Sequence, residues 1–166
     1  MSLVVDVRDL LGEPGASRRV VIREGVPALA TELARILEGR PVACEFLIES
    51  VVDGLMVSGA IRGTMELACA RCLESFESEV RVEVHERFVE GAAPGADEYP
   101  VADGFADLEA MVRDSIMLAM PFAPLCKPGC LGLCDRCGGD RNLGECRCEQ
   151  EADPRWSALQ RLNVSD

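Results

Sequence analysis

Two stretches in the middle of the chain alternate between hydrophobic and polar residues with a period of two. In residues 55–67 the odd positions carry apolar residues or glycine, and the even positions are mostly polar or small. The same alternation returns in residues 76–88. Because successive side chains of a β-strand point to opposite faces, both stretches are predicted as half-buried strands. An apolar run at 46–52 leads into Asp53-Gly54, a pair favoured in two-residue hairpins, so we predict an antiparallel three-stranded meander.

Two other stretches have the three- and four-residue spacing of an amphipathic helix. Pro27 precedes residues 28–37, whose leucines and isoleucine lie close to helical spacing, and proline is favoured in the first helical turn. Asp107 is predicted to cap a helix over 107–120, where apolar residues recur at steps of three and four. Pro121 is predicted to end this helix.

The remaining segments are less regular. Residues 3–7 and 18–22 are predicted as short strands, because a turn-rich segment separates two mainly hydrophobic runs. The acidic stretch up to Asp103, which begins with Gly91-Ala92-Ala93-Pro94-Gly95, is predicted as a solvated loop. Asp153-Pro154 is predicted to start a last helix over 155–162 that docks on the body.

These elements predict an α+β fold. Its antiparallel β-meander, over residues 43–88, packs on one or two helices, and a C-terminal cysteine-rich, zinc-ribbon-like segment follows. We expect residues 1–125 to form the α+β body. Residues 126–166 form a cysteine-rich tail with a short helix, integrated with the body into one domain.

Charge narrows the range of partners. The chain has 166 residues and a net charge of −12, and its first 125 residues contain 11 arginines against 22 acids. An acidic body disfavours tight binding to a phosphate backbone, so any nucleic-acid contact is expected to be local. The acidic surface serves either solubility or the capture of a basic protein. The sequence has no run of apolar residues long enough for a membrane span and no secretory leader, which predicts a cytoplasmic protein with reduced thiols and no membrane partner.

Four of the nine cysteines form a compact set near the C-terminus. Cys134 and Cys137 have the two-residue spacing that lets two thiolates reach one ion from a tight turn, and Cys146 and Cys148 follow after eight residues. We predict that these four cysteines bind a structural zinc ion. An iron–sulfur cluster and free or partly oxidised thiols are the alternatives.

Four further cysteines predict a second site. Cys69 and Cys72 lie where the second and third meander strands must turn, and Cys126 and Cys130 are the other close pair. Together they could form a second zinc site that ties the tail to the sheet. In a rival arrangement Cys126 or Cys130 belongs to the C-terminal set instead. A redox pair normally starts a helix, whereas a strand precedes this one, so metal binding is favoured over thiol exchange. Cys44, alone in an apolar strand, is predicted to be core.

With these residues in view, the chain resembles the YceD family, named for accumulation of the large ribosomal RNA subunit. The resemblance covers about residues 40–162. The segments that carry it are Cys69-Ala70-Arg71-Cys72-Leu73-Glu74, Leu118-Ala119-Met120-Pro121, Pro124-Leu125-Cys126, the run from Cys130 to Gly138, Asn142-Leu143, Cys146-Arg147-Cys148 and Asp153-Pro154-Arg155-Trp156.

The resemblance implies a non-enzymatic bacterial factor that supports accumulation, processing or assembly of the large-subunit (23S) ribosomal RNA. Its partners would be a ribosomal precursor, a basic ribosomal protein or the rRNA itself, and no small-molecule substrate is expected. The residues agree with a non-enzymatic role, because His85 lies on the polar face of a strand and forms no catalytic constellation. Arg136, Arg141 and Arg147 could make a limited RNA or protein contact, or belong to an ordinary solvated loop. The alternative function is thiol redox or metal handling by the C-x2-C pairs.

Overall fold

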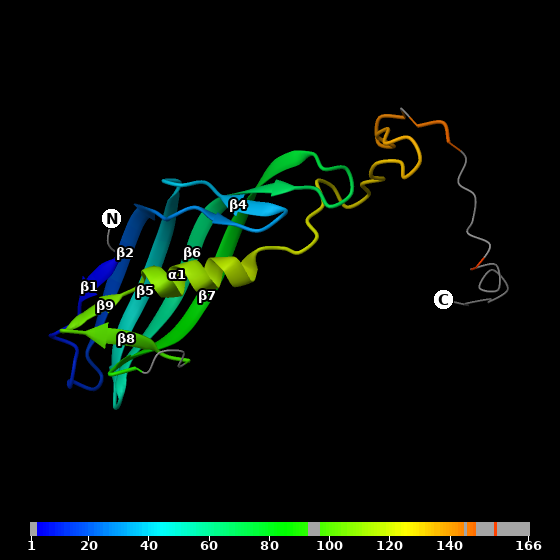
Figure 1. Cartoon of the computed structure of the whole chain (residues 1–166). Helices are drawn as coiled ribbons and strands as arrows, with labels where there is room; N and C mark the ends of the chain where they lie inside the picture. Colours follow the sequence, from blue (N-terminus) through cyan, green and yellow to red (C-terminus); the bar gives the residue numbers. More distant parts are fainter. Residues whose placement is uncertain (1–2, 93–96, 145, 149–154, 156–166) are drawn as a thin grey trace.

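The computed structural model describes residues 3–92, 97–144, 146–148 and 155 (Figure 1). In this part of the chain, nine strands form one sheet and a single helix follows them. The elements are β1 (Val4–Asp6), β2 (Ser17–Gly25), β3 (Leu29–Ala30), β4 (Ala34–Ile36), β5 (Pro41–Val51), β6 (Gly54–Ala68), β7 (Ser75–Glu90), β8 (Tyr99–Ala102), β9 (Phe105–Asp107) and α1 (Glu109–Ala119).

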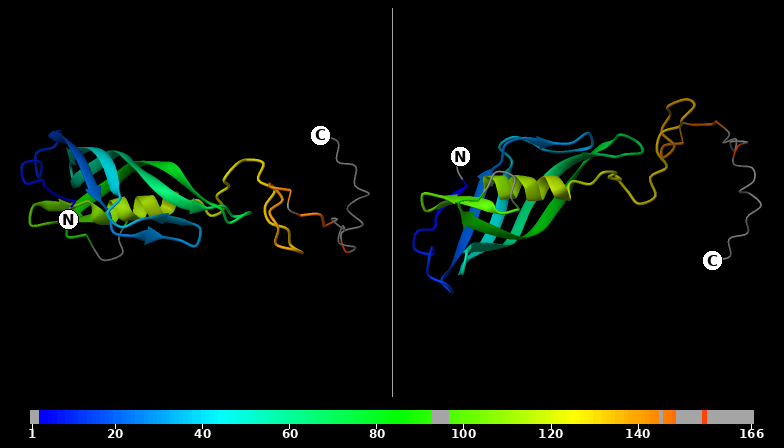
Figure 2. Two further views of the ribbon diagram at one scale, coloured as in Figure 1. Left: turned by 90° about the horizontal axis from the view of Figure 1, so that it is seen from above. Right: turned by 60° about the horizontal axis from the view of Figure 1, so that its bottom comes forward.

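The sheet is curled into a half-barrel around the two longest strands, β6 and β7. Its main order is β1-β9-β8-β7-β6-β4-β3, and β5 also pairs with β6 and carries β2 on its other edge. One half of β6 pairs with β5 and its far end with β4. The β6–β7 hairpin therefore reaches past β5 toward the cysteine-rich segment, which lies beyond that end of the sheet in both views of Figure 2.

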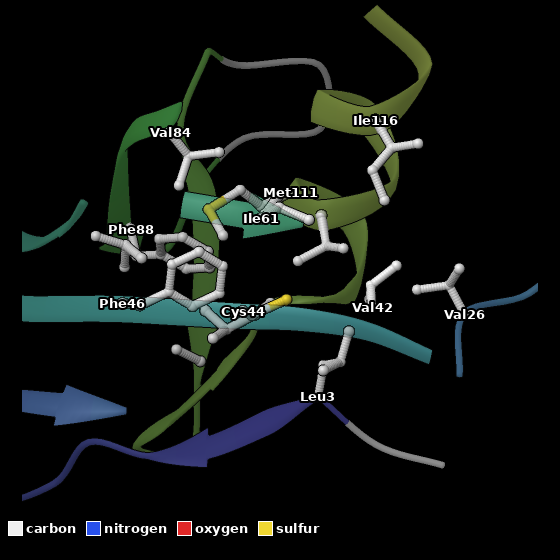
Figure 3. Packing of buried hydrophobic residues seen from close by; sticks show 14 of the residues in the cluster. Leu3, Val26, Val42, Cys44, Phe46, Ile61, Val84, Phe88, Met111 and Ile116 are labelled. Carbon is white, nitrogen blue, oxygen red and sulfur yellow. The ribbon is translucent and has the colours of Figure 1, made fainter. Parts of the chain in front are cut away.

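The core lies between the concave face of the sheet and α1, which crosses β5, β6 and β7 (Figures 1 and 3). Phe46, Ile61 and Phe88 from the sheet meet Met111 and Ile116 from the helix, and each is at most 1% exposed. Complete burial of one such side chain contributes roughly 1.5–3 kcal/mol, so this layer fixes the helix on the sheet.

The predicted meander is confirmed. Strands β5, β6 and β7 pair antiparallel, with Leu55 opposite Phe88 and Ile48 opposite Val57. The turn differs by one residue from the prediction, because Gly54 already pairs with Val51 and the two loop residues are Val52 and Asp53. Glycine is required at position 54, where φ is 142° and a Cβ atom would lie 2.3 Å from the carbonyl oxygen of Phe88.

The predicted helix near the end of the body is also confirmed. α1 spans Glu109–Ala119, and its apolar stripe is buried against the sheet. Asp107 accepts a hydrogen bond from the backbone N–H of Glu109 at 2.9 Å, although the capping position itself is Leu108. The carboxylate thus satisfies one of the free N–H groups of the first turn.

The α+β prediction is wrong, because the chain is mostly β with a single helix in the described residues. The predicted helix over 28–37 forms the two short strands β3 and β4 instead. Ala34 and Ile36 are buried at alternate positions, as in a strand. Leu37, the last apolar residue of the predicted helix, is 40% exposed. Pairing of β4 with the end of β6 overrides the local helical pattern.

The acidic segment before Asp103 was also predicted wrongly in part. Tyr99–Ala102 is strand β8, which pairs in parallel with the end of β7. The Tyr99 ring stacks on Phe88, with centroids 5.2 Å apart, so the segment joins the core instead of remaining a loop. The short strands predicted at 3–7 and 18–22 are confirmed as β1 and β2.

The helix predicted over 155–162 lies outside the described residues apart from Arg155. The division into a body (1–125) and a tail (126–166) stays a prediction. Within the described part of the chain, no helix combines the length and apolar character needed to cross a membrane.

Candidate metal centres

The tip of the β6–β7 hairpin is docked on the segment that follows α1. The Ala70 N–H donates to the carbonyl oxygen of Pro124 at 2.8 Å, and the Arg71 guanidinium donates to the carbonyl oxygen of Cys130 at 2.8 Å. The Leu133 N–H donates to the carbonyl oxygen of Arg71 at 3.0 Å. These bonds bring cysteines from two distant parts of the sequence to one place.

Four of those cysteines, Cys69, Cys72, Cys126 and Cys130, form the first cysteine group. Their sulfur atoms all lie within 4.8 Å of one another. The Cys69 and Cys130 sulfurs are 3.7 Å apart, and those of Cys72 and Cys126 are 3.6 Å apart. Four sulfurs at about 2.3 Å from a tetrahedral zinc ion would be roughly 3.8 Å apart, so the group has the size of a zinc–thiolate site.

The second cysteine group consists of Cys134, Cys137, Cys146 and Cys148, whose sulfurs also lie within 4.8 Å of one another. A tight turn positions the first two, since the Gly138 N–H donates to the carbonyl oxygen of Cys134 at 2.9 Å. Gly138 has a φ of 71°, a conformation that other residues rarely adopt. The two groups differ in exposure: Cys69 and Cys130 are fully buried, whereas Cys137 and Cys148 are exposed.

One cysteine of each group has a pKa well below the usual value of a thiol. Hydrogen bonds from backbone amides, chiefly that of Cys126, lower the pKa of Cys69 to about 6. Amides of Cys137 and Arg136 likewise lower the pKa of Cys134 to about 6. Burial raises the pKa of Cys126 to about 12, so a metal-free group also contains protonated thiols. Binding of a metal ion must therefore release protons, and it weakens as the pH falls.

This geometry suits a closed metal site better than thiol chemistry. Four thiolates fill the tetrahedral coordination of zinc and leave no position for water or substrate, as in structural sites. The Cys69–Cys72 pair lies in the turn between β6 and β7, not at the start of a helix where a dipole would activate an attacking thiol. In addition, each of its sulfurs lies next to a further cysteine.

The structure brings together all eight cysteines predicted as ligands, in two sets of four. Cys126 and Cys130 both lie with the hairpin pair and not with the C-terminal set, which favours the first of the two predicted arrangements. Cys44 is fully buried in the core, as predicted, and His85 is exposed on the outer face of β7. The cysteine spacings assigned no role to Asn142, whose side chain contacts a sulfur of the first group.

A curled, mostly antiparallel sheet with two four-cysteine groups at one end defines a small β-protein with a cysteine-based module. The chain belongs to the YceD family, whose model, described as "Large ribosomal RNA subunit accumulation protein YceD", matches residues 57–163. This description suggests a role in accumulation of the large-subunit ribosomal RNA. The match includes both cysteine groups.

Relatives from mycobacteria match along nearly the whole chain. An uncharacterized protein of Mycobacterium tuberculosis is 32% identical over 164 residues, which cover 95% of this chain and 79% of the relative. An uncharacterized protein of Mycobacterium leprae is 30% identical over 177 residues, which cover 99% of this chain and 79% of the relative. No solved structure matches.

Proposed function

We propose that this protein is a non-enzymatic factor that supports the accumulation of large-subunit ribosomal RNA by acting in its processing or in ribosome assembly. Membership of the YceD family is the observation that carries the proposal. The proposed mode of action is binding, because the four-cysteine groups suit structural sites and His85 stands exposed on the sheet opposite Ser58. We place this activity in the cytoplasm.

The metal in both groups is proposed to be zinc. Sulfur separations of 3.6 and 3.7 Å support this, as does the donor set of four thiolates in each group. The ions would fold the cysteine-rich segment and hold it against the hairpin tip. Apolar packing is sparse in the described part of this segment, where Leu131 is 62% and Leu143 is 71% exposed.

The proposed partner is a basic ribosomal protein or a precursor particle that contains one. The net charge of −12 favours a basic surface over naked RNA. A limited RNA contact through Arg136, Arg141 and Arg147 is part of the proposal. The Arg141 guanidinium lies 3.6 Å from the carboxylate of Asp135, whose side chain is exposed.

A pull-down from cells at moderate salt tests the proposal. The wild-type protein is compared with a variant in which Arg136, Arg141 and Arg147 are alanine. We expect the wild type to enrich large-subunit precursors or basic ribosomal proteins, and the variant to recover severalfold less precursor RNA.

The matched control replaces three arginines of the body, Arg35, Arg40 and Arg113, and changes the net charge equally. Equal recovery with the wild type and this control is the expected result. Absence of ribosomal material from the wild-type sample would contradict the proposed function. Equal losses in both variants would instead contradict the role given to the three tail arginines.

A further inference from the structure

Asn142 connects the two cysteine groups. Its Nδ2 donates to the sulfur of Cys130, in the first group, at 3.5 Å. Its Oδ1 accepts the backbone N–H of Leu131, the residue next to that ligand, at 2.9 Å. The side chain therefore reaches both the sulfur and the backbone beside it.

The position of Asn142 in the chain belongs to the second group. It lies between Cys137 and Cys146, in a loop that two ligands of that group enclose. Asp140 fixes it there, because one carboxylate oxygen accepts both the N–H and the Nδ2–H of Asn142 at 2.7 Å. If the four sulfurs of the second group bind one ion, the loop between Cys137 and Cys146 is closed at both ends. This closure restricts the conformations of the loop and so holds the Asn142 amide in place.

We propose that Asn142 couples the two metal sites, so that an ion in the second group tightens the binding of an ion in the first. This inference rests on the proposed binding of metal by both groups. The amide N–H stabilises the negatively charged Cys130 thiolate, and it is held in position when the second site is filled. By linkage, an ion in the first site tightens the second by the same factor. Loss of such a supporting hydrogen bond typically costs 10- to 100-fold in metal affinity.

Because the second group is more exposed than the first, we expect the second group to release its metal ion first. Chelators reach the exposed Cys137 and Cys148 before the buried Cys69 and Cys130. Release from zinc-loaded protein in excess chelator is therefore expected in two phases, with the second group emptying in the fast phase. The fast phase therefore reports on the second site while the first site is still filled, which is the state in which the coupling acts.

The test is a double-mutant cycle on the release rate from the second site, which by linkage loses the same coupling. In Asn142→Asp the oxygen that accepts the Leu131 N–H is kept and the donor to sulfur is lost, and Asn142→Ala removes both. We expect either change to accelerate the fast phase 10- to 100-fold. Leu143→Ala, at the exposed neighbouring residue, should leave both phases unchanged.

Cys72→Ser empties the first site and should accelerate release from the second by a similar factor. Adding Asn142→Asp to Cys72→Ser should then change the rate little, because the amide no longer contacts a metal-bound thiolate. Asn142 acting only on the local fold would instead make the two effects multiply, and that result would overturn the coupling, as would an unchanged fast phase in both Asn142 variants. Reduced wild-type protein that takes up no metal would contradict the metal sites themselves, a failure that metal content distinguishes from a failed coupling.

Discussion

Tyr99, the single tyrosine of the chain, is a direct reporter of the packing between β8 and α1. Its hydroxyl donates to the Asp114 carboxylate at 3.3 Å. Burial, followed by the charges of Asp114 and Glu86, raises the pKa of Tyr99 to about 12. An ionised phenolate would be poorly hydrated and would face these carboxylates.

We predict that the folded protein ionises Tyr99 near pH 12, measured as phenolate absorbance. The folded-state pKa lies above the unfolded value of about 10, so this contribution to stability is complete below pH 10 and is lost as the pH rises towards 12. Asp114→Asn should lower the pKa, and Asp103→Asn, which removes a carboxylate elsewhere, should not. A midpoint near 10 in the folded wild type would show that the ring is hydrated.

At the scale of elements, the first cysteine group connects the tip of the β6–β7 hairpin to the segment after α1. The sheet has its own apolar core, whereas we propose that metal binding supplies most of the folding free energy of the cysteine-rich segment. Replacement of a ligand should therefore disorder the tip and leave the sheet folded.

Hydrogen exchange of Cys72→Ser tests this prediction. The amides of Leu73 and Leu133 should exchange at least 10-fold faster, while those of Val57 and Val84 in the sheet should keep their protection. Cys44→Ala is the matched control, because it removes a buried core thiol and should lower the stability of the sheet without reducing metal content. Equal loss of protection throughout Cys72→Ser would contradict a local role.

The same elements show what the sequence could predict. Apolar and polar residues alternate over long spans of β6 and β7, so this periodicity and the turn residues between the strands were enough to predict the meander. Residues 28–37 were misread because short strands leave too little periodicity to outweigh a helical spacing of leucines, and the pairing of β4 with β6 is a long-range contact. β8 was missed for the same reason, since it is four residues long and its parallel pairing with β7 involves no hairpin turn that a sequence pattern would reveal.

The candidate site was predicted more completely than the fold. The short spacings identified the cysteine pairs, and the predicted hairpin placed Cys69 and Cys72 at a shared tip. Asn142 could not be found in this way, because its contact with Cys130 depends on the conformation of residues 138–144.

At the scale of the whole molecule, the fold gathers arginines that are distant in sequence. Arg23, Arg62 and Arg81 lie in one row across the outer face, in register through Ala43. Two of them already pair with carboxylates: Arg62 with Glu45 at 2.9 Å, and Arg81 with Glu83 at 2.7 Å. Two of the three positive charges in the row are therefore paired, and the chain as a whole has a net charge of −12.

We therefore predict weak binding of generic single-stranded RNA at physiological salt. Three phosphate contacts, one for each of Arg136, Arg141 and Arg147, would give a log–log salt slope no steeper than about −2, measured by fluorescence titration. Replacement of the three row arginines by alanine should change this weak binding little. Tight binding with a steep slope, abolished by those replacements, would contradict the charge argument and identify the outer face as an RNA-binding surface.

The most direct test of the central claim is the metal content and coordination of the purified, reduced protein, prepared without chelators. Two four-cysteine groups predict about two zinc ions per chain, each with four sulfur neighbours at about 2.3 Å by X-ray absorption. Cys134→Ser should retain about one ion, and Cys44→Ala should retain both. A metal content near zero, or coordination dominated by nitrogen and oxygen, would contradict the account.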